Sequence, residues 1–575
     1  MRPFRFSPAL PRTPALTLGD GLILLGIATL LYAGARLAFN APTIVAGPDI
    51  SLSPKALPWY ALLSVGRMTA AYFLSLLFSL FYGYAAAHNR TARIILMPLL
   101  DILQSVPILS FLPVVLLSFS SILPTALASE LAAIVLIFTS QAWNMTFSFY
   151  QSMTTLPMEL REAGAIFRFS PWLRFKTVEL PFSAIGLIWN SIMSWSGGWF
   201  FLMASEIFHV GERDFRLPGL GSYLQTAANA GDRSALLFGL ATLILVIILL
   251  DQLIWKPLLA WADKFKLEMV ESDEPHSSWF LEVLSRSWLI EKFGTLYWNP
   301  FVEKVDQRWQ NSAAASIAPL EESDSNGRPS WGAITLGILF FLVVLYGGYR
   351  AAGLLLSLSA SAWLHLAIGL LATFARVAVA LFITLLWTVP VGVAIGMNRR
   401  LAFLLQPIAQ VVASIPATAL FPVLLLALIH APGGLNLAAV TLMLMGTQWY
   451  LLFNVIAGAA AIPQDLRFTS DLLRFSSVDR WRNLILPALF PYLVTGSITA
   501  SGGAWNASII AEHVEFGGRT YETTGIGAMI AEATANGDFA LLLAGTLGLV
   551  VTVVLINRTF WRWLYLIAEE RYRME

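Results

Sequence analysis

The sequence predicts an all-α polytopic membrane protein with about twelve transmembrane helices in two parallel six-helix repeats. Three observations support this prediction. The 575 residues are 57% hydrophobic and 12% charged, whereas soluble domains carry about 25% charged residues. Apolar runs long enough to cross a bilayer recur along the whole chain. Motifs of the first half return in the second half at an offset of 306 to 309 residues, which is the signature of an internal repeat.

Transmembrane helices are expected wherever about 20 apolar residues follow one another. The expected spans are 17–38, 58–86, 94–119, 124–150, 183–207, 234–258, 331–351, 362–396, 401–429, 434–458, 488–512 and 538–561. This division gives a first repeat with its N-terminal helix at 1–258, a cytoplasmic linker at 259–330 and a second repeat at 331–575. Because each repeat has an even number of helices, both repeats enter the membrane from the same side, and a path between them is expected.

Arginines in short loops predict the orientation, because cytoplasmic loops are enriched in Lys and Arg. Arg90 and Arg93 follow the second expected helix, and Arg399 and Arg400 stand at the matching place in the second half. Both termini are therefore expected in the cytoplasm. The loop 208–233 argues the other way, since it would lie outside and contains three arginines, but acidic residues accompany them.

Charge and cysteine content narrow the possible partners. The net charge is +1, and no basic domain is present to neutralise phosphates, so we expect the lipid bilayer and no nucleic acid as a partner. The chain has no cysteine, which excludes disulfides and thiolate metal sites. In the linker, the aromatic and amphipathic stretch 279–309 is too charged to span and is expected at the cytoplasmic interface.

Two charged loops interrupt the apolar runs at matching places. They are LPMELREAGAIFRFSPWLRFKTVELP at 156–181 and IPQDLRFTSDLLRFSSVDRWRNLILP at 462–487. Pro157 suits the first turn of a short helix, and the sequence Phe169-Ser170-Pro171 should end that helix. We expect two short helices parallel to the membrane, which expose Phe167, Arg168 and Phe169 to a docking partner. The alternative is an ordinary basic loop that only fixes topology.

These loops resemble the EAA motif of permeases in binding-protein-dependent ABC importers. The first copy has Glu162-Ala163-Gly164 and ends in Val178-Glu179-Leu180-Pro181. The second copy keeps Leu484-Ile485-Leu486-Pro487 but has Phe468 in place of the first Glu. At the glycine of the family pattern, this chain has Arg168 in one copy and Arg474 in the other.

The rest of each half resembles the nitrate/sulfonate/taurine branch of these permeases. The segments 105–113 and 414–422 are similar to its S-I-P...P segment. Ala204-Ser205-Glu206 followed by Gly219-x-Gly221, and Ala511-Glu512 followed by Gly525-x-Gly527, are similar to its A-E...G-L-G segment. Two permease domains in one chain depart from the usual separate subunits.

The resemblance implies a permease with a type I ABC importer-like fold in the bacterial inner (plasma) membrane. It implies a cytoplasmic ABC ATPase dimer and an external, periplasmic solute-binding protein as partners. The cargo would be a small solute or anion such as nitrate, a sulfonate, taurine or bicarbonate. The residues expected to couple to the ATPase are Glu159, Arg161, Glu162, Ala163, Gly164, Arg168, Phe169, Asp465, Arg467, Asp471, Arg474 and Phe475.

Catalytic motifs are absent from the sequence. It contains no G-x-x-x-x-G-K-[ST] phosphate-binding loop, no H-E-x-x-H and no G-x-S-x-G, so we expect no catalytic residues, no metal and no cofactor in this chain. The chain is therefore not expected to be an enzyme, and ATP-Mg is expected in the partner ATPase.

Polar residues inside the spans are candidates for the translocation path, because an acidic residue at mid-bilayer costs about 2.5–3.5 kcal/mol and normally faces the interior or water. The expected path residues are Gln141, Asn144, Trp199, Glu206, Gln448, Trp449, Trp505, Asn506 and Glu512. Three alternatives stay open. The amides can tie helices together, the two carboxylates can cap helix ends, and Arg67 and Arg376 can face the path or snorkel to the interface.

The sequence leaves a second hypothesis, an ion-coupled secondary transporter with two parallel repeats. It predicts carboxylates in the path and gives no reason for two matched loops. A membrane enzyme or scaffold is a third class, but it lacks a catalytic constellation. The loops 208–233 and 513–537 are candidates for docking a binding protein, with a short surface or re-entrant helix in each, or they are simple connectors.

Overall fold

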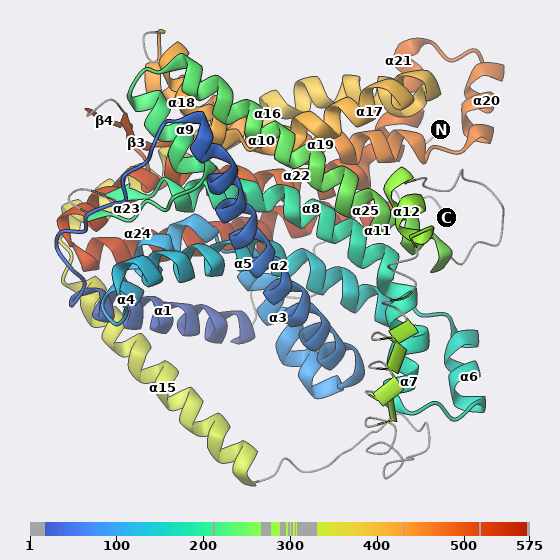
Figure 1. The fold of residues 1–575 in the computed structure, drawn as a ribbon, viewed down its shortest axis with the longest axis horizontal. Coiled ribbons are helices and arrows are strands. Elements are labelled where there is room, and N and C mark those ends of the chain that lie inside the picture. The colour runs from blue at the N-terminus through green and yellow to red at the C-terminus, as the bar shows by residue number, and fades with distance from the viewer. Residues whose placement is uncertain are drawn as a thin grey trace.

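The computed structural model is almost entirely helical and describes residues 18–210, 213–265, 278–287, parts of 292–307, 331–428, 431–516 and 519–571 (Figure 1). The helices of the first half are α1 (Leu18–Ala38), α2 (Leu57–His88), α3 (Arg90–Ser105), α4 (Leu112–Ser120), α5 (Thr125–Thr154), α6 (Met158–Ile166), α7 (Pro171–Arg174), α8 (Leu180–Glu206), α9 (Leu220–Asn229), α10 (Arg233–Leu250) and α11 (Lys256–Ala262). In the linker lies α12 (Trp279–Ser285). Those of the second half are α15 (Trp331–Leu356), α16 (Ala360–Met397), α17 (Arg399–Ala413), α18 (Ala417–Leu428), α19 (Gly434–Ala460), α20 (Gln464–Leu472), α21 (Ser477–Arg480), α22 (Leu486–Ala511), α23 (Ile526–Asn536), α24 (Phe539–Ile556) and α25 (Arg562–Arg571).

Short elements connect these helices. They are the 3-10 turns η1 (Pro54–Ala56), η2 (Ile108–Phe111) and η5 (Asp263–Phe265), and the π-helical turns η3 (Phe175–Glu179), η4 (Asp251–Trp255), η7 (Trp481–Ile485) and η8 (Asn557–Trp561). Two antiparallel hairpins join β1 (His209–Val210) to β2 (Arg213–Asp214) and β3 (His513–Phe516) to β4 (Arg519–Glu522).

Three helices form the centre of each half, α2, α5 and α8 in the first and α16, α19 and α22 in the second. Glycines permit the close packing at equivalent positions. Gly83 lies against Phe149 of α5, and Gly392 lies against Val455 of α19. Small residues of this kind let membrane helices approach one another closely. The two halves therefore repeat their packing as well as their sequence, which confirms the predicted all-α fold with an internal repeat.

The number of spans is lower than predicted when it is judged by length and hydropathy. In the described part of the chain, nine helices meet the criterion for a membrane span, or ten if the bent pair α3–α4 is one span. The predicted count of twelve is reached only if α8 and the pair α17–α18 are also counted as spans. They are the repeat equivalents of α22 and of the pair α3–α4. The α10 rod also continues through η4 and α11 to Ala262, four residues beyond the predicted boundary at 258.

The predicted span 94–119 is not one continuous helix. The structure bends there by 85° between Arg90–Ser105 and the helical stretch that begins at Ile108. The cause is Pro107, since proline disfavours helical geometry in the residue before it, and Val106 is extended at φ −73° and ψ 124°. The predicted span 401–429 is likewise divided into α17 and α18 at Ser414-Ile415-Pro416.

In each half, the last central helix is followed by a β-hairpin and then by a short helix. The sequence predicted a short helix in these loops, and α9 and α23 are present, but it did not predict the strands. In the first hairpin His209 pairs with Asp214, and in the second His513 pairs with Glu522. Figure 1 shows β3, β4 and α23 at the left, opposite α6 and α20 at the right. We call these two sides of the protein the hairpin side and the loop side.

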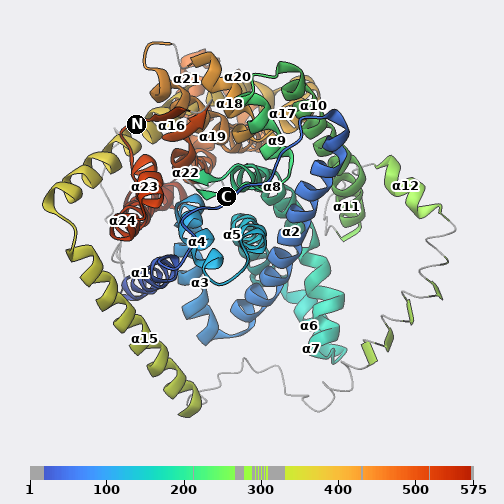
Figure 2. The same ribbon diagram turned by 60° about the vertical axis from the view of Figure 1, so that its left-hand side comes forward.

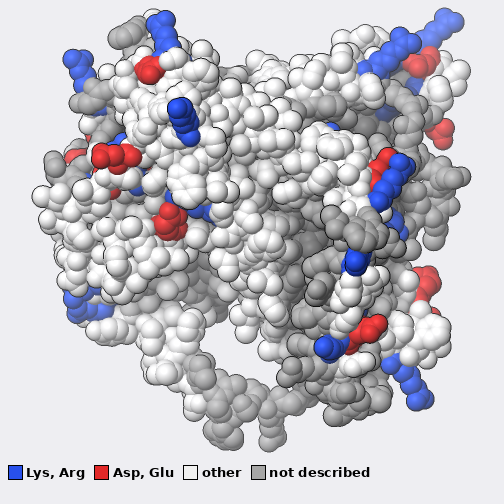
Figure 3. Space-filling model, in the orientation of Figure 1, with Lys and Arg blue, Asp and Glu red and all other residues white. Residues whose placement is uncertain are grey.

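Charged side chains gather toward these two sides. In Figure 3 the Lys, Arg, Asp and Glu side chains lie toward the left and right of the molecule, and the band between them shows few charged side chains. This distribution is what a bilayer of about 30 Å hydrocarbon thickness requires. The band marks the part of the protein that lies in the membrane.

The first helix of each half lies outside the central helices. The helix α1 packs on α4 and on α24 of the other half, whereas α15 packs mainly on α1. Thr29 donates a hydrogen bond to the carbonyl of Val344 at 2.9 Å, and Gly347 lies against Thr29. Figure 2 shows α15 at the edge of the molecule, so the repeat symmetry ends at this helix.

The linker returns to the loop of the first half. Asp306 accepts a hydrogen bond from Trp172 Nε1 at 2.9 Å and forms an ion pair with Lys176. These two contacts lower the pKa of the Asp306 carboxyl, the ion-paired hydrogen bond from Lys176 most strongly. Part of the amphipathic stretch 279–309 lies outside the described residues. Its predicted place at the membrane interface stays a prediction, as do the domain boundaries.

Candidate translocation path and coupling loops

The loops 156–181 and 462–487 have the same backbone. In each, a proline that starts a short helix is followed by a Schellman motif at the helix end. In the first copy the N–H groups of Phe169 and Arg168 donate to the carbonyls of Gly164 and Ala165 at 2.9 and 3.0 Å. In the second copy the N–H groups of Phe475 and Arg474 donate to the carbonyls of Ser470 and Asp471 in the same way. Both of those bonds measure 3.0 Å.

The glycine position of the family pattern is a left-handed position. Arg168 has φ 50° and Arg474 has φ 52°, and they are the only non-glycine residues with positive φ in the described chain. A left-handed conformation costs a residue with a Cβ about 1–2 kcal/mol, which is why glycine suits this site. Both copies therefore keep the backbone although they have lost the glycine.

One predicted coupling residue of each loop points back into the protein. Arg161 donates from Nη2 to the carbonyls of Met153 and Thr154 at 3.2 and 3.3 Å, at the end of α5. Arg467 donates in the same way to Ala459 at 2.6 Å, at the end of α19. The last carbonyls of a helix lack partners within it. These two arginines thus fasten each short helix to the end of a central helix.

Apolar side chains form the exposed tip of each loop. Ile166 and Phe167 are 77% and 71% exposed, and their equivalents Leu472 and Leu473 are 83% and 62% exposed. Phe169 is only half-buried by contrast, since it folds back toward Gly164. The structure therefore supports Phe167 and Arg168 as exposed residues and adds Ile166, Leu472 and Leu473 to the surface.

The remaining predicted coupling residues lie on the same surface in most cases. Glu159, Glu162 and Asp465 are exposed, and Asp471 forms an ion pair with Arg480. Gly164 is buried and Ala163 is half-buried. Their contact with an ATPase stays a prediction.

A buried ion pair closes the hairpin side of the first half. Arg67 of α2 donates from Nη1 to Glu206 Oε1 at 2.8 Å and binds Glu130 of α5 through two hydrogen bonds of 2.6 and 2.7 Å. Glu206 is completely buried and also accepts from Ser64 Oγ and from the N–H of Gly221, both at 2.7 Å. A carboxylate with three donors can remain charged away from water.

The second half repeats this ion pair with two substitutions, Thr373 for Ser64 and Asn436 for Glu130. Arg376 donates to Glu512 Oε1 at 2.7 Å, and Glu512 also accepts from Thr373 Oγ1 at 2.7 Å and from the N–H of Gly527 at 2.8 Å. Asn436 replaces Glu130 and accepts from Arg376 at 2.8 and 2.9 Å. We call Arg67–Glu206 and Arg376–Glu512 the two Arg–Glu locks. The first has an additional negative charge that the second lacks.

The two Arg–Glu locks define the surroundings of Glu206 and Glu512. Both carboxylates are held inside one half, and neither lines the two cavities described below. The sequence identified both arginines and both glutamates at matching positions, but not the pairing between them. The second glycine of each Gly-x-Gly supplies the backbone donor.

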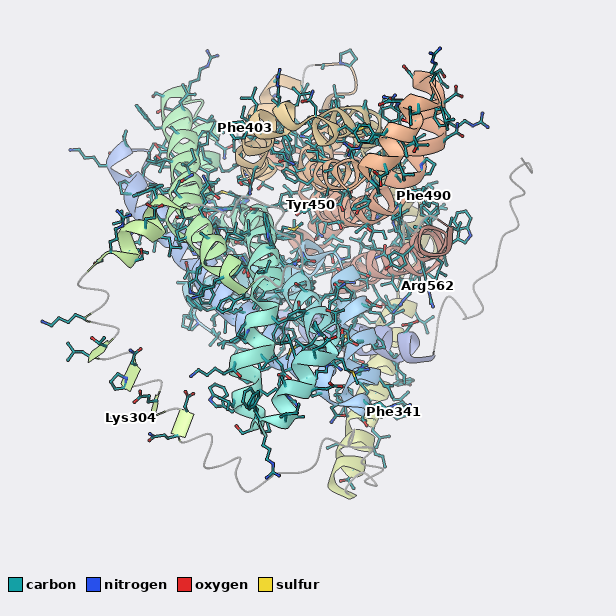
Figure 4. The ribbon with its side chains drawn as sticks, turned by 90° about the vertical axis from the view of Figure 1, so that its right-hand side faces the viewer. Lys304, Phe341, Phe403, Tyr450, Phe490 and Arg562 are labelled. Carbon is teal, nitrogen blue, oxygen red and sulfur yellow. The ribbon has the colours of Figure 1, made fainter. Side chains whose placement is uncertain are left out.

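A cavity of about 460 Å³ lies between the two halves and is called the central cavity. Its walls come from α8 of the first half and from α17, α19 and α22 of the second half, together with the turn before α18. Figure 4, viewed from the loop side, shows Tyr450 between the helices of the two halves. Of the predicted path residues, Trp449 and Asn506 line this cavity.

The other predicted path residues lie elsewhere. Trp199 and Trp505 are buried in the cores of their halves, Gln141 is fully buried between helices, and Asn144 is exposed. Gln448, one residue before Trp449, is half-buried and is not part of the cavity wall. The prediction missed Trp189 and Phe453, which line it together with Gln406 and Gln410.

A second cavity of about 330 Å³ lies nearer the hairpins. Its walls include His209 and Arg216 of the first half and His513 of the second. Arg216 is held by Asp214 through hydrogen bonds of 2.5 to 2.9 Å. These bonds raise the pKa of the Arg216 guanidinium.

Two reciprocal contacts separate the cavities. The N–H of Leu109, in the bend of the first half, donates to Asn506 Oδ1 of α22 at 3.3 Å. Thr418, just after the bend of the second half, donates to the carbonyl of Phe200 of α8 at 3.3 Å. Each bend therefore contacts a central helix of the other half. Along α8 the central cavity ends at Phe201, and the second cavity begins at Ala204.

Two parallel halves with cavities between them and matched loops on one side define a membrane transport protein with an internal repeat. The family model described as "Binding-protein-dependent transport system inner membrane component" matches residues 75–254 and again 388–573. The chain belongs to this family and contains its domain twice, which confirms the resemblance drawn from the loops.

Individual relatives belong to the same branch. The nitrate import permease protein NrtB of Synechocystis sp. is 31% identical over 191 residues, which are 32% of this chain and 66% of the relative. The bicarbonate transport system permease protein CmpB of Synechococcus elongatus is 30% identical over 194 residues, 34% of this chain and 66% of the relative. The taurine transport system permease protein TauC of Escherichia coli is 25% identical over 203 residues, covering 35% and 68%. The chain spans just under two thirds of the length of the first two.

Proposed function

We propose that this chain is the transmembrane permease subunit of an ATP-driven ABC importer for a small solute. The observation that carries the proposal is the pair of coupling loops. Two loops 306 residues apart share a Schellman motif, a left-handed arginine and an exposed apolar tip on one side of the membrane. A single partner surface, present twice in an ATPase dimer, would fit both.

The proposed orientation places the loop side in the cytoplasm. Arg90 and Arg399 begin α3 and α17 just after long spans, and basic residues favour the cytoplasmic side. The hairpins then face the periplasm, where a solute-binding protein would dock. The chain would be a multi-pass protein of the inner membrane with both termini in the cytoplasm.

The proposed mechanism is alternating access between the halves. The central cavity lies on the cytoplasmic side of the contacts at Asn506 and Phe200, so the present structure corresponds to an inward state. ATP binding to the separate ATPases would draw the loops together and open the contact between the bends and central helices. Because a ligand shifts an equilibrium only through differential affinity, ATP and the loaded binding protein must both prefer the outward state.

The two Arg–Glu locks suit this mechanism as fixed points. Each lock ties the hairpin-side end of α8 or α22 to α2 or α16 of the same half. A half held in this way moves as one body, and the motion is confined to the interface between the halves. The carboxylates are then structural rather than part of the path.

The secondary transporter remains the alternative function, and the cavity walls disfavour it. Among the described residues that line the two cavities, none is Asp or Glu. Ion-coupled transport uses carboxylates that face the path and bind a proton or a cation. Here Glu206 and Glu512 are each paired with an arginine of their own half.

Affinity purification after coexpression with the ATPase and binding protein encoded by neighbouring genes tests the proposal. The double variant Phe167→Asp and Leu473→Asp should lose the ATPase and ATP-dependent uptake, because charge is introduced into both apolar tips. The matched control is Val283→Asp in α12, which is also exposed at 56% and should change neither. ATP-independent uptake, or an ATPase still bound to the double variant, would count against the proposal.

A further inference from the structure

We infer that the central cavity selects an organic solute with an apolar body of about the size of an aromatic ring, in preference to a compact inorganic anion. The inference rests on the proposed function, because it assigns a cargo class to the path between the halves. It concerns the chemistry of the cavity wall, which the coupling loops do not determine.

Aromatic side chains dominate the wall. They come from α8 of the first half and α19 of the second, and they are Trp189, Phe200, Phe201, Trp449, Tyr450 and Phe453. On α19 the spacing from Trp449 to Phe453 is about one helical turn, so both rings project from one face. Rings from both halves thus surround one space of about 460 Å³.

The polar groups of the wall are uncharged. Gln406 and Gln410 stand one turn apart on α17, and Ser414 follows at the bend. None of the described residues that line the cavity is Lys, Arg, His, Asp or Glu. Asn506 is already engaged, since its amide accepts from Leu109 and donates to the carbonyl of Gly502 at 3.0 Å. The two glutamines, Ser196 and the Tyr450 hydroxyl are therefore uncharged donors for a polar head group.

The composition of the wall determines which solutes bind favourably in the central cavity. A compact anion loses its hydration and meets no cation, and the burial of an unpaired charge is strongly unfavourable. The faces of aromatic rings carry partial negative charge, which further opposes an anion. An apolar body gains free energy in proportion to the area it removes from water. A carboxylate that carries a ring therefore offsets part of the charge penalty that a compact anion meets in full, and its head can bind the uncharged donors of the wall.

The aromatic wall does not follow the symmetry of the repeat. The first-half equivalents of Tyr450 and Gln410 are Asn144 and Asp101, and Asp101 forms an ion pair with Arg558 at 3.5 Å. The second-half equivalents of Trp189 and Phe200 are Thr495 and Asn506. The equivalents of Trp449 and Phe453 are the aromatic Trp143 and Phe147, so the repeat accounts for two of the six rings but not for the other four.

Equilibrium dialysis of the purified full-length chain in lipid nanodiscs tests the inference with three probes. Radiolabelled benzoate and acetate have the same head group and differ in the body, nitrate is the compact anion, and empty nanodiscs measure partition into lipid. Benzoate should bind at least about tenfold tighter than acetate, and equimolar nitrate should not displace it. Equal affinities, displacement by equimolar nitrate, or no binding of benzoate above empty nanodiscs would overturn the inference.

A matched pair of variants locates the binding. Trp449→Leu removes a ring of the wall and should weaken benzoate binding about fivefold or more, whereas Trp143→Leu, at the equivalent position of the first half and outside the wall, should not. Trp449→Phe keeps a ring and should retain most of the binding if the leucine variant fails to fold. Equal losses from Trp449→Leu and Trp143→Leu would overturn the assignment.

The two proposals fail differently. ATP-dependent uptake of nitrate by the assembled transporter, with no binding of benzoate, would leave the importer proposal intact and refute the cargo class. Benzoate binding at Trp449 without any ATP-dependent uptake would refute the importer proposal and leave the cargo class intact.

Discussion

Removal of the Arg67 side chain should strongly destabilise the first half, because it leaves a buried charge without its partner. Arg67 and Glu206 are 4% and 0% exposed. In Arg67→Leu the carboxylate stays buried and keeps only the donors Ser64 and Gly221. Removal of one partner of a buried ion pair costs about 3–5 kcal/mol, because the other charge remains uncompensated. We expect a loss in this range in the free energy of unfolding.

Two companion variants separate the charge effect from the packing effect. The double variant Arg67→Leu and Glu206→Leu should recover about 2 kcal/mol or more of the loss, because replacing both charges removes the desolvation cost. Glu130→Gln should cost about 1 kcal/mol or less, since Glu130 is 38% exposed and an exposed ion pair contributes little.

Reversible unfolding in mixed micelles with increasing sodium dodecyl sulfate, followed by tryptophan fluorescence, provides the measurement. The reasoning would be refuted if Arg67→Leu cost less than about 1 kcal/mol, or if the double variant were as unstable as the single variant. Arg376→Leu tests the same reasoning in the second half, where Glu512 would keep the donors Thr373 and Gly527.

Three further predictions use the same unfolding assay or a distance measurement. Gly219→Ala should cost about 1–3 kcal/mol, because a Cβ there would meet the Glu206 carboxylate, whereas Gly502→Ala has open space and should be neutral or stabilising; equal effects would contradict this. Arg168→Gly should be about 1 kcal/mol more stable than Arg168→Ala, since only glycine relieves the left-handed strain at φ 50°, and no difference would argue against that strain. The Asp306–Lys176 contact should persist above the ordinary carboxyl pKa and weaken as the pH falls through the lowered pKa of Asp306. Spin labels at Thr177 and Lys304 should move apart at low pH or in Asp306→Asn at neutral pH, and an unchanged distance would contradict the contact.

The repeat could be predicted from the sequence because its landmarks are rare residues at fixed offsets. The two loops are recognisable in this way, and the sequence itself shows the departure at Arg168 and Arg474. The left-handed backbone was not predictable, since arginine disfavours it. The inward direction of Arg161 depends on the end of α5, which the loop sequence does not contain.

The site residues were harder to predict, because they depend on contacts between distant segments. Arg67 and Glu206 are 139 residues apart in the sequence, and the recurrence of each in the second half does not show that they pair. The central cavity follows neither repeat. It uses α8 from one half and α17 and α19 from the other, and the equivalent positions differ in character. A symmetric prediction therefore included Gln141 and Gln448 and missed Trp189 and Phe453.

The distance between the two coupling loops tests the central claim most directly. The chain has no cysteine, so spin labels at Phe167 and Leu473 can be introduced as single cysteines in a background free of others. In the complex with its ATPases, the distance between the labels should shorten when ATP binds and return after hydrolysis. A distance that is the same with and without ATP, in a complex that still transports, would contradict the proposed coupling.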